Sequence, residues 1–126
     1  MVGIWQALRR GGKMNDKPEK MRIIVDIDET ICDYGGGDKY AEREYPRAKP
    51  IVENIEMINE LYDQGHEIVY WTARGSISGL DWTDLTLSQL DEWGAKYHEA
   101  SCGKPHYDLF ICDKAINSYN FFKNGG

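Results

Sequence analysis

The stretch from residue 21 to residue 33 reads Met-Arg-Ile-Ile-Val-Asp-Ile-Asp-Glu-Thr-Ile-Cys-Asp. Its first part, Ile23 to Val25, is a β-branched apolar run typical of a buried strand that is covered on both faces. The run ends in Asp26 and Asp28, which only Ile27 separates. Because side chains alternate along an extended chain, we expect both carboxylates on the same side, at the carboxyl end of the strand.

Two carboxylates this close repel each other unless a cation or a shared proton relieves the repulsion. Mg²⁺ prefers oxygen ligands of this kind, so the acidic pair indicates a metal site. The alternative for the pair by itself is a strand followed by an acidic turn, because Asp-x-Asp is a common sequence. Other polar residues of the chain have to decide between these two interpretations.

Length and composition predict one globular domain with a single core: the chain has 126 residues, of which 41% are hydrophobic and 29% charged. A formal net charge of -6 argues against a general nucleic-acid-binding protein, which would carry a basic face. No apolar run reaches the ~20 residues that a membrane-spanning helix needs. Three cysteines without a metal-binding spacing, and the lack of a signal peptide pattern, predict a cytoplasmic protein with reduced thiols.

Residues 1–20 contain glycines, a proline and many charges, a composition that predicts a flexible N-terminal extension. The alternative is one helical turn, formed by Ile4, Trp5 and Leu8, that docks on a partner. The folded domain is expected to span residues 21–124.

Helix and strand patterns alternate after the first strand. Residues 32–49 are polar and irregular, as in a flap over a site. The spacing of Ile51, Ile55 and Ile58 predicts an amphipathic helix that starts near Pro50 and stops at Gly65. The remaining expected elements are a strand at 66–72, a helix from Thr83 to Gly94, strands at 97–102 and 107–112, and a short closing helix around 116–122. This order predicts an α/β fold with a mainly parallel sheet.

Polar residues follow three of the predicted strands directly. Asp26 and Asp28 follow the first strand, Thr72 ends the second, and Asp113 follows the strand at 107–112. In parallel sheets, ligands bind beyond the carboxyl ends of the strands. Four polar side chains from three strands are expected to meet at that edge, which favours a functional site over a simple acidic turn.

These motifs carry a family resemblance. Asp26-Ile27-Asp28-Glu29-Thr30, Thr72, Lys104 and Asp113 resemble, in chain order, the four motifs of the haloacid dehalogenase (HAD) superfamily, over roughly residues 21 to 120. The runs Tyr-Trp-Thr-Ala-Arg-Gly and Gly-Lys-Pro are similar to small HAD hydrolases of capsule and sugar-phosphate biosynthesis. The resemblance implies a three-layer Rossmannoid fold. Minimal or no cap domain is expected, because the stretches before Pro50 and before Lys104 are too short for one.

The resemblance also implies a reaction: hydrolysis of a phosphomonoester through an aspartyl-phosphate intermediate. Asp26 would be the nucleophile. Asp28 would be the general acid and base, a role suited to a carboxyl group whose pKa is raised by its neighbours. Thr72 would bind the phosphoryl group, and Lys104 would neutralise the charge that develops on it.

The cofactor implied by the resemblance is Mg²⁺. Its ligands would come from Asp26, the main-chain carbonyl of Ile27, and Asp113, with Asp28 also at the metal site. Cys112 stands where many relatives carry the first aspartate of an Asp-Asp pair, so we expect a weaker affinity for the metal.

Arg74 lies two residues past Thr72 and is expected to contact a second anionic group of the substrate; the alternative is a solvated loop residue. The expected substrate is a sugar phosphate or a related small metabolite. An uncapped site either admits a bulky substrate or is covered by a neighbouring subunit of a homo-oligomer. Two alternative functions remain: a nucleotidase or polynucleotide-end phosphatase, which the acidic charge disfavours, and a non-catalytic phosphate-binding module.

Overall fold

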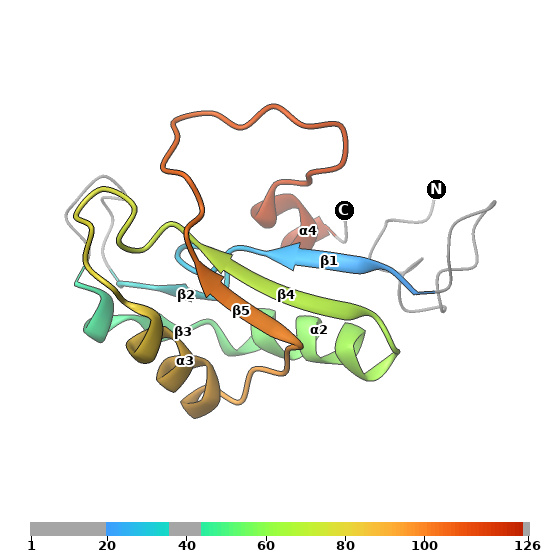
Figure 1. The fold of residues 1–126 in the computed structure, drawn as a ribbon. Coiled ribbons are helices and arrows are strands. Elements are labelled where there is room, and N and C mark those ends of the chain that lie inside the picture. Colours follow the sequence, from blue (N-terminus) through green and yellow to red (C-terminus); the bar gives the residue numbers. More distant parts are fainter. Residues whose placement is uncertain (1–19, 36–43, 125–126) are drawn as a thin grey trace.

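A computed structural model describes residues 20–35 and 44–124 of the chain. Its centre is a three-stranded parallel sheet in the order β1 (Arg22–Val25), β4 (Glu67–Thr72) and β5 (Glu99–Cys102), with β1 at one edge. Val25 lies opposite Tyr70, and Thr72 lies opposite Cys102. All three strands therefore end at the same edge of the sheet (Figure 1), and the predicted α/β fold with a mainly parallel sheet is confirmed.

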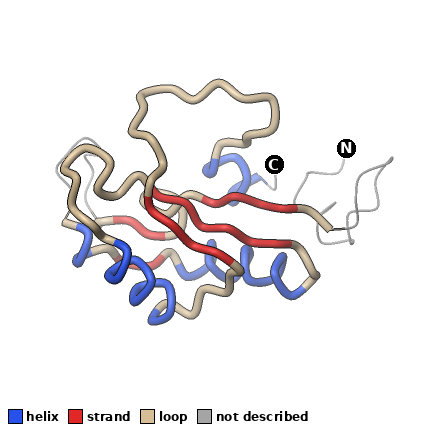
Figure 2. The backbone as a smooth tube through the Cα atoms, in the orientation of Figure 1, coloured by secondary structure: helices blue, strands red, loops and turns tan. Residues whose placement is uncertain are grey.

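Helices lie on both sides of this sheet. Helices α2 (Val52–Asp63) and α3 (Thr83–Glu92) lie on one side, and α4 (Ser118–Asn124) lies on the other (Figures 1 and 2). Gly65 ends α2 as expected: it has a φ of 97°, and its N–H donates to the carbonyl of Tyr62 at 3.0 Å. The helices predicted near 51–64 and 83–94 and the closing helix are therefore present.

The hydrophobic core joins the sheet to the turn that follows β1. Ile27, Ile31 and Cys32 are fully buried, at 1%, 0% and 0% exposure, and belong to one cluster with side chains of α2, α3, α4 and β4. Burying side chains of this size contributes about 1.5–3 kcal/mol each. Asp26 and Asp28 therefore flank a core residue, and the core holds the backbone that carries them.

The segment that follows Ile31 is partly regular. Strand β2 (Cys32–Asp33) pairs antiparallel with β3 (Lys49–Pro50), and the short 3-10 helix η1 (Tyr45–Arg47) precedes β3. The rest of the predicted flap, residues 36–43, lies outside the described residues, as do residues 1–19 of the predicted flexible extension. Among the described residues, no helix is long and apolar enough to cross a membrane.

The strand predicted at residues 107–112 is wrong. Residues 103–117 form a loop that arches away from the sheet (Figure 1), and Leu109, Phe110 and Ile111 are 75%, 56% and 88% exposed. The length of the connection excludes a parallel neighbour for β5. A crossover between parallel strands needs a dozen or so residues, and only four residues separate Cys102 from Tyr107.

Truncation of two isoleucines tests this description of the loop. Ile111→Ala is expected to change the free energy of unfolding by no more than about 0.5 kcal/mol, because the side chain is already in solvent. Ile31→Ala, at a position with 0% exposure, is expected to cost about 2–5 kcal/mol. Urea unfolding of both variants gives the comparison. A similar loss in the free energy of unfolding at the two positions would show that Ile111 packs in the core.

Candidate active site

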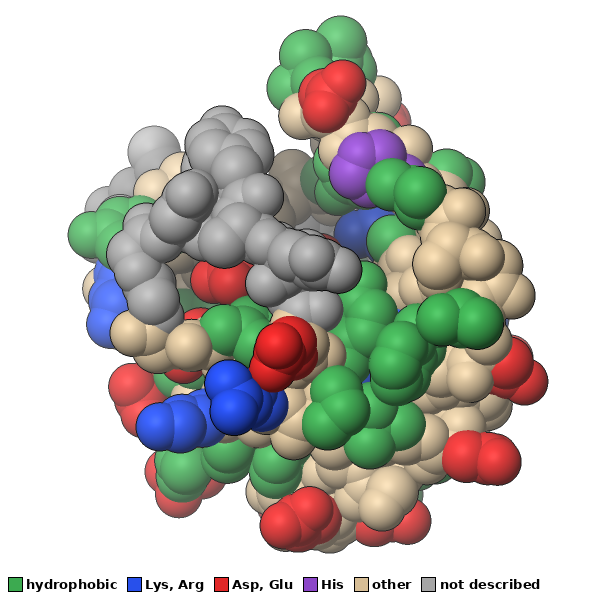
Figure 3. All heavy atoms as spheres, turned by 90° about the vertical axis from the view of Figure 1, so that its left-hand side faces the viewer, with side chains coloured by type: hydrophobic (Ala, Val, Ile, Leu, Met, Phe, Trp, Pro, Cys, Tyr) green, Lys and Arg blue, Asp and Glu red, His purple; other side chains and the backbone are tan. Residues whose placement is uncertain are grey.

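The carboxyl edge of the sheet brings together most of the residues that the sequence singles out. Asp26 and Asp28 follow β1, Thr72 ends β4, and Lys104 lies just beyond β5. The N–H of Lys104 donates to the carbonyl of Thr72 at 3.1 Å, which joins the ends of β4 and β5. Figure 3 looks onto this edge, where acidic and basic side chains lie among hydrophobic ones.

Asp26 faces a cation and remains accessible. Its Oδ2 lies 3.4 Å from Nζ of Lys104, and 39% of its side chain is exposed. Its Oδ1 accepts the N–H of Ile27 at 2.9 Å, which fixes the carboxylate on its own backbone. Burial raises the pKa of Asp26 above its usual range, and the Lys104 ammonium partly counters that rise. The ammonium group beside this accessible carboxylate can bind an anionic ligand.

Asp28 is held by three neighbouring side chains, one of which is Cys32, whose thiol donates to Oδ1 at 3.4 Å. Nε and Nη2 of Arg74 donate to its Oδ2 and Oδ1 at 3.1 and 2.9 Å, and the hydroxyl of Tyr34 donates to Oδ1 at 2.5 Å. Burial by itself would raise the pKa of Asp28, but the Arg74 guanidinium and the Tyr34 hydroxyl outweigh it and hold the pKa below its usual range. The raised pKa expected for a general acid is therefore wrong, and Asp28 is a carboxylate at neutral pH.

Arg74 does not face a substrate space. The residue is 2% exposed, and its guanidinium donates five hydrogen bonds within the protein. Besides those to Asp28, Nη1 donates to Gln89 Oε1 at 2.6 Å and to Thr86 Oγ1 at 3.2 Å. The guanidinium also lies 4.8 Å from the centre of the Tyr45 ring. Neither expectation for Arg74, a substrate contact or a solvated loop residue, agrees with this burial.

Thr72 supports the turn that carries Arg74. Its side chain is buried, at 1% exposure, and Oγ1 accepts the N–H of Arg74 at 3.2 Å. The hydroxyl keeps its own proton for donation. Gly75 follows with a φ of 84°, and a Cβ at this position would lie 2.1 Å from the carbonyl oxygen of Leu80. The 73–80 turn is therefore closed in a form that only glycine fits at position 75.

A pair of alanine substitutions separates backbone strain from that clash. Gly79 has a similar φ, 77°, but open space around it. Gly79→Ala should lower the free energy of unfolding by about 1–2 kcal/mol, the cost of a left-handed conformation. Gly75→Ala should cost clearly more, because the turn must also open. Equal losses in thermal or urea unfolding would show that the contact with Leu80 does not constrain the turn.

The expected metal ligands are not assembled. The carbonyl of Ile27 accepts the N–H groups of Thr30 and Ile31 at 3.1 and 2.9 Å, so it is directed into the turn after β1. Asp113 is exposed in the 103–117 loop, because the strand that was expected to bring it to the sheet edge does not form. Among the described residues, no group of three or more His, Cys, Asp or Glu side chains is placed to hold a metal ion.

Four partners of the central ion pair are not among the residues that the sequence motifs single out: Cys32, Tyr34, Thr86 and Gln89. A signal for two of them is present in α3. Thr86 and Gln89 are three residues apart and share the buried face of the helix with Leu90. Polar side chains on a buried helix face need a buried polar partner, and Arg74 is that partner. Tyr34 lies in a polar stretch without any comparable pattern.

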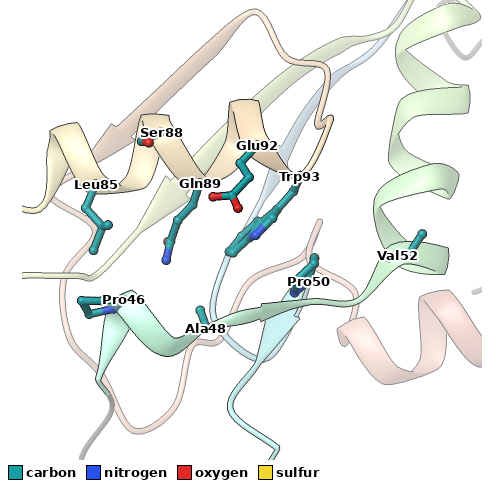
Figure 4. A pocket seen from close by; sticks show the side chains of 9 residues that line it. All are labelled: Pro46, Ala48, Pro50, Val52, Leu85, Ser88, Gln89, Glu92 and Trp93. Carbon is teal, nitrogen blue, oxygen red and sulfur yellow. The ribbon is translucent and has the colours of Figure 1, made fainter.

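A separate hollow of about 490 Å³ lies between α3 and the segment from η1 to the start of α2. Figure 4 shows Gln89 of α3, and Trp93 directly after this helix, directed across it toward Ala48 and Pro50. Its other lining residues are Pro46, Val52, Leu85, Ser88 and Glu92. Asp26, Asp28, Thr72 and Lys104 are not part of this lining, so the hollow lies outside the candidate active site.

Comparison with known proteins supports the fold. No family model matches the chain, and no curated protein matches it. The chain is similar to the crystal structure of a structural genomics target from Vibrio cholerae, with a TM-score of 0.67 and 26% identity over 81% of this chain and 86% of that one. The protein is therefore a mixed α/β protein with a mainly parallel sheet and a solved structural relative.

The Asp28–Arg74 pair should be essential for stability, since both partners are buried, at 9% and 0% side-chain exposure. Asp28→Asn would leave a buried guanidinium without its counter-charge, and we expect a loss of about 3–5 kcal/mol in the free energy of unfolding at pH 7. The matched control is Asp63→Asn, which removes an exposed ion pair with Lys96 at 2.8 Å and should cost no more than about 1 kcal/mol.

The same experiment has a pH dependence with a defined sign. The pKa of Asp28 is lowered in the folded protein from an ordinary value of 3.8. Its stabilisation is therefore complete above that value and is lost as the pH falls through the folded pKa. The difference in stability between wild type and Asp28→Asn should shrink in acid. A difference that stays constant down to strongly acidic pH would contradict the ionised state of Asp28.

Proposed function

We propose that the protein is a HAD-like phosphomonoester hydrolase that acts through an aspartyl-phosphate on a sugar phosphate or a related small metabolite. One observation carries the proposal: the accessible Asp26 carboxylate lies 3.4 Å from the Lys104 ammonium, at the carboxyl edge of a parallel sheet. Its second support is the chain order of the four sequence motifs, three of which meet at this edge.

In the first step, an oxygen of Asp26 attacks phosphorus. The new bond joins Asp26 to the phosphoryl group, and the bond from phosphorus to the ester oxygen breaks, with the electron pair leaving on that oxygen. A carboxylate needs no base to activate it. The Lys104 ammonium lies where it can offset the negative charge of the phosphoryl oxygens in the transition state. Thr72 anchors both neighbouring turns through its backbone carbonyl and its hydroxyl.

In the second step, water attacks the aspartyl-phosphate. Phosphate leaves and Asp26 returns to its carboxylate form. Asp28, already ionised, accepts a proton from the water. Because Asp28 is ionised, it is available as the base of this step and not as an acid in the first step. The departing alkoxide of a sugar phosphate therefore takes its proton from solvent water, and Asp28 afterwards returns its own proton to the solvent. Aryl phosphates, whose leaving groups need no proton, are therefore the most direct test substrates.

Magnesium enters the proposal through the sequence motifs alone. The described conformation does not fit a magnesium site, because Arg74 occupies Asp28, the Ile27 carbonyl faces the turn, and Asp113 is exposed on its loop. The two steps above therefore use only the side chains that meet at the sheet edge. Assays with Mg²⁺ and with EDTA test whether the reaction requires the metal.

Substitution of the nucleophile tests the mechanism. Asp26→Asn should lower the turnover of an aryl phosphate by about 10³-fold or more, because no covalent intermediate can form, while circular dichroism and the unfolding midpoint stay close to those of wild type. Mass spectrometry after acid quenching should find one phosphoryl group on wild type and none on the variant. Asp63→Asn is the control for removal of a carboxylate elsewhere. Undiminished turnover by Asp26→Asn would overturn the proposal.

A substrate panel tests the class of ester, with sugar phosphates, nucleotides and oligonucleotides bearing terminal phosphates, each assayed with Mg²⁺ and with EDTA. Preferred hydrolysis of sugar phosphates supports the proposal. Preference for nucleotides or oligonucleotide ends would identify a nucleotidase or an end phosphatase instead. Binding of phosphate without turnover of any compound would identify a non-catalytic module.

A further inference from the structure

We propose that Arg74 and Gln89 are positioning residues that aim one oxygen of Asp28, Oδ2, at the water of the dephosphorylation step. The inference rests on the proposed hydrolase function and adds to it the residues that set the rate of its second half. Neither residue contacts the reacting atoms. Both act through the orientation of the Asp28 carboxylate.

The contacts of Asp28 leave one lone pair free. A carboxylate has about four acceptor sites, two on each oxygen. Oδ1 accepts Nη2 of Arg74 at 2.9 Å, the Tyr34 hydroxyl at 2.5 Å and the Cys32 thiol at 3.4 Å, whereas Oδ2 accepts Nε of Arg74 at 3.1 Å. Among the contacts of the described residues, the second lone pair of Oδ2 is the one that remains for a proton from water.

The bidentate geometry fixes the direction of that lone pair. Two parallel N–H groups of one guanidinium edge hold both oxygens, so the carboxylate plane cannot rotate without breaking a charge-assisted hydrogen bond. A lysine ammonium at this position would supply charge but not two parallel donors. The orientation of Asp28 is therefore a property of the arginine fork and not of positive charge alone.

Arg74 is in turn held from behind by α3 and η1. Gln89 accepts Nη1 of Arg74 at 2.6 Å and donates through Nε2 to the carbonyl of Tyr45 at 2.7 Å. Gln89 is itself buried, at 6% exposure. Its amide thus ties the guanidinium to the helix on one side and to the backbone of η1 on the other. Loss of this amide should loosen the fork without removing it.

Arg74 cannot serve as a second phosphate-binding cation in this arrangement. Its side chain is 0% exposed in the ion pair, while that of Lys104 is 14% exposed beside Asp26. To reach a substrate, the guanidinium would have to give up Asp28 or Gln89 and leave a buried polar group unpaired, which costs about 1–3 kcal/mol for each group. Of the two cations, Lys104 would therefore contact the phosphoryl group, whereas Arg74 contacts Asp28.

Arg74→Lys should therefore slow the second step selectively. With an aryl phosphate, kcat/KM reports the steps up to release of the phenol, and kcat reports dephosphorylation once that step is slow. We expect kcat to fall by about 10–100-fold, the scale of a misplaced catalytic group, KM to fall with it, and kcat/KM to stay within about threefold. A burst of phenol and accumulated phosphoenzyme should appear. Gln89→Leu should show the same pattern with a smaller loss in kcat.

Two further measurements separate positioning from a merely structural role. Arg47→Lys makes the same replacement at an exposed arginine, 81% of whose side chain is in solvent, and should leave both kinetic constants unchanged. For Arg74→Ala, added guanidinium should restore kcat in part, because it can re-form the fork against Asp28, whereas the same concentration of ammonium should not.

The outcomes distinguish this inference from the function on which it rests. Equal losses in kcat and kcat/KM for both Arg74→Lys and Gln89→Leu, with no burst, would overturn the positioning role while leaving the hydrolase intact. Full activity of Asp26→Asn would overturn the aspartyl-phosphate mechanism of the proposed function itself. If Arg74→Lys does not fold, Gln89→Leu alone decides: a burst with an unchanged kcat/KM supports positioning, and its absence contradicts it.

Discussion

The ion pair between Arg74 and Asp28 is the interaction on which the rest of the site depends. It joins the turn after β1 to the turn after β4, and through Thr86 and Gln89 it reaches α3. Removal of two charges from water costs several kcal/mol for each ion, and such a pair is tolerable only when the remaining donors and acceptors are also satisfied. Here each N–H of the guanidinium has a partner, which is why the pair can be both buried and rigid.

The ion pair also makes the electrostatic surroundings of the two aspartates different. Asp28 has a guanidinium and a hydroxyl to itself, while Asp26 has the more exposed Lys104. The pKa of the first is lowered and that of the second is raised, although one residue separates them in the chain. Beneath them, Ile27 and Ile31 are fixed in the core, so the backbone that carries both aspartates is held in place.

Much of the fold could be predicted from local patterns. The spacing of Ile55 and Ile58 defines a helix whose buried face is evident in the sequence, and the β-branched run before Asp26 defines a strand. The prediction that this strand is covered on both faces is wrong, because Ile24 is 57% exposed at the edge of the described sheet. The run at 107–112 has the same β-forming character, but a pattern within one segment does not count the residues needed to reach a neighbouring strand. Because the strand predicted at 107–112 does not form, Asp113 does not lie at the sheet edge, where it was predicted.

The sequence predicts which residues lie at the candidate site, but it does not predict what each of them contacts there. Residues at strand ends meet because the sheet is parallel, so Asp26, Asp28, Thr72 and Lys104 could be placed together. Which acceptor a guanidinium finds depends on packing between α3 and the sheet. The spacing of Thr86 and Gln89 indicates a buried polar partner, but it does not show that this partner is Arg74 or that Arg74 pairs with Asp28. The direction of the Ile27 carbonyl depends on the tight turn through Glu29, whose φ of 63° is rare for a residue with a side chain.

The uncovered run from Leu109 to Ile111 has a consequence for the protein in concentrated solution. In the described sheet, β1 has a neighbour on one side only, and Ile24 on it is 57% exposed. An unpaired strand edge and an apolar, β-prone segment are complementary surfaces, and on separate molecules they attract each other. At high concentration these two surfaces therefore favour contacts between copies of the chain, which the net negative charge opposes.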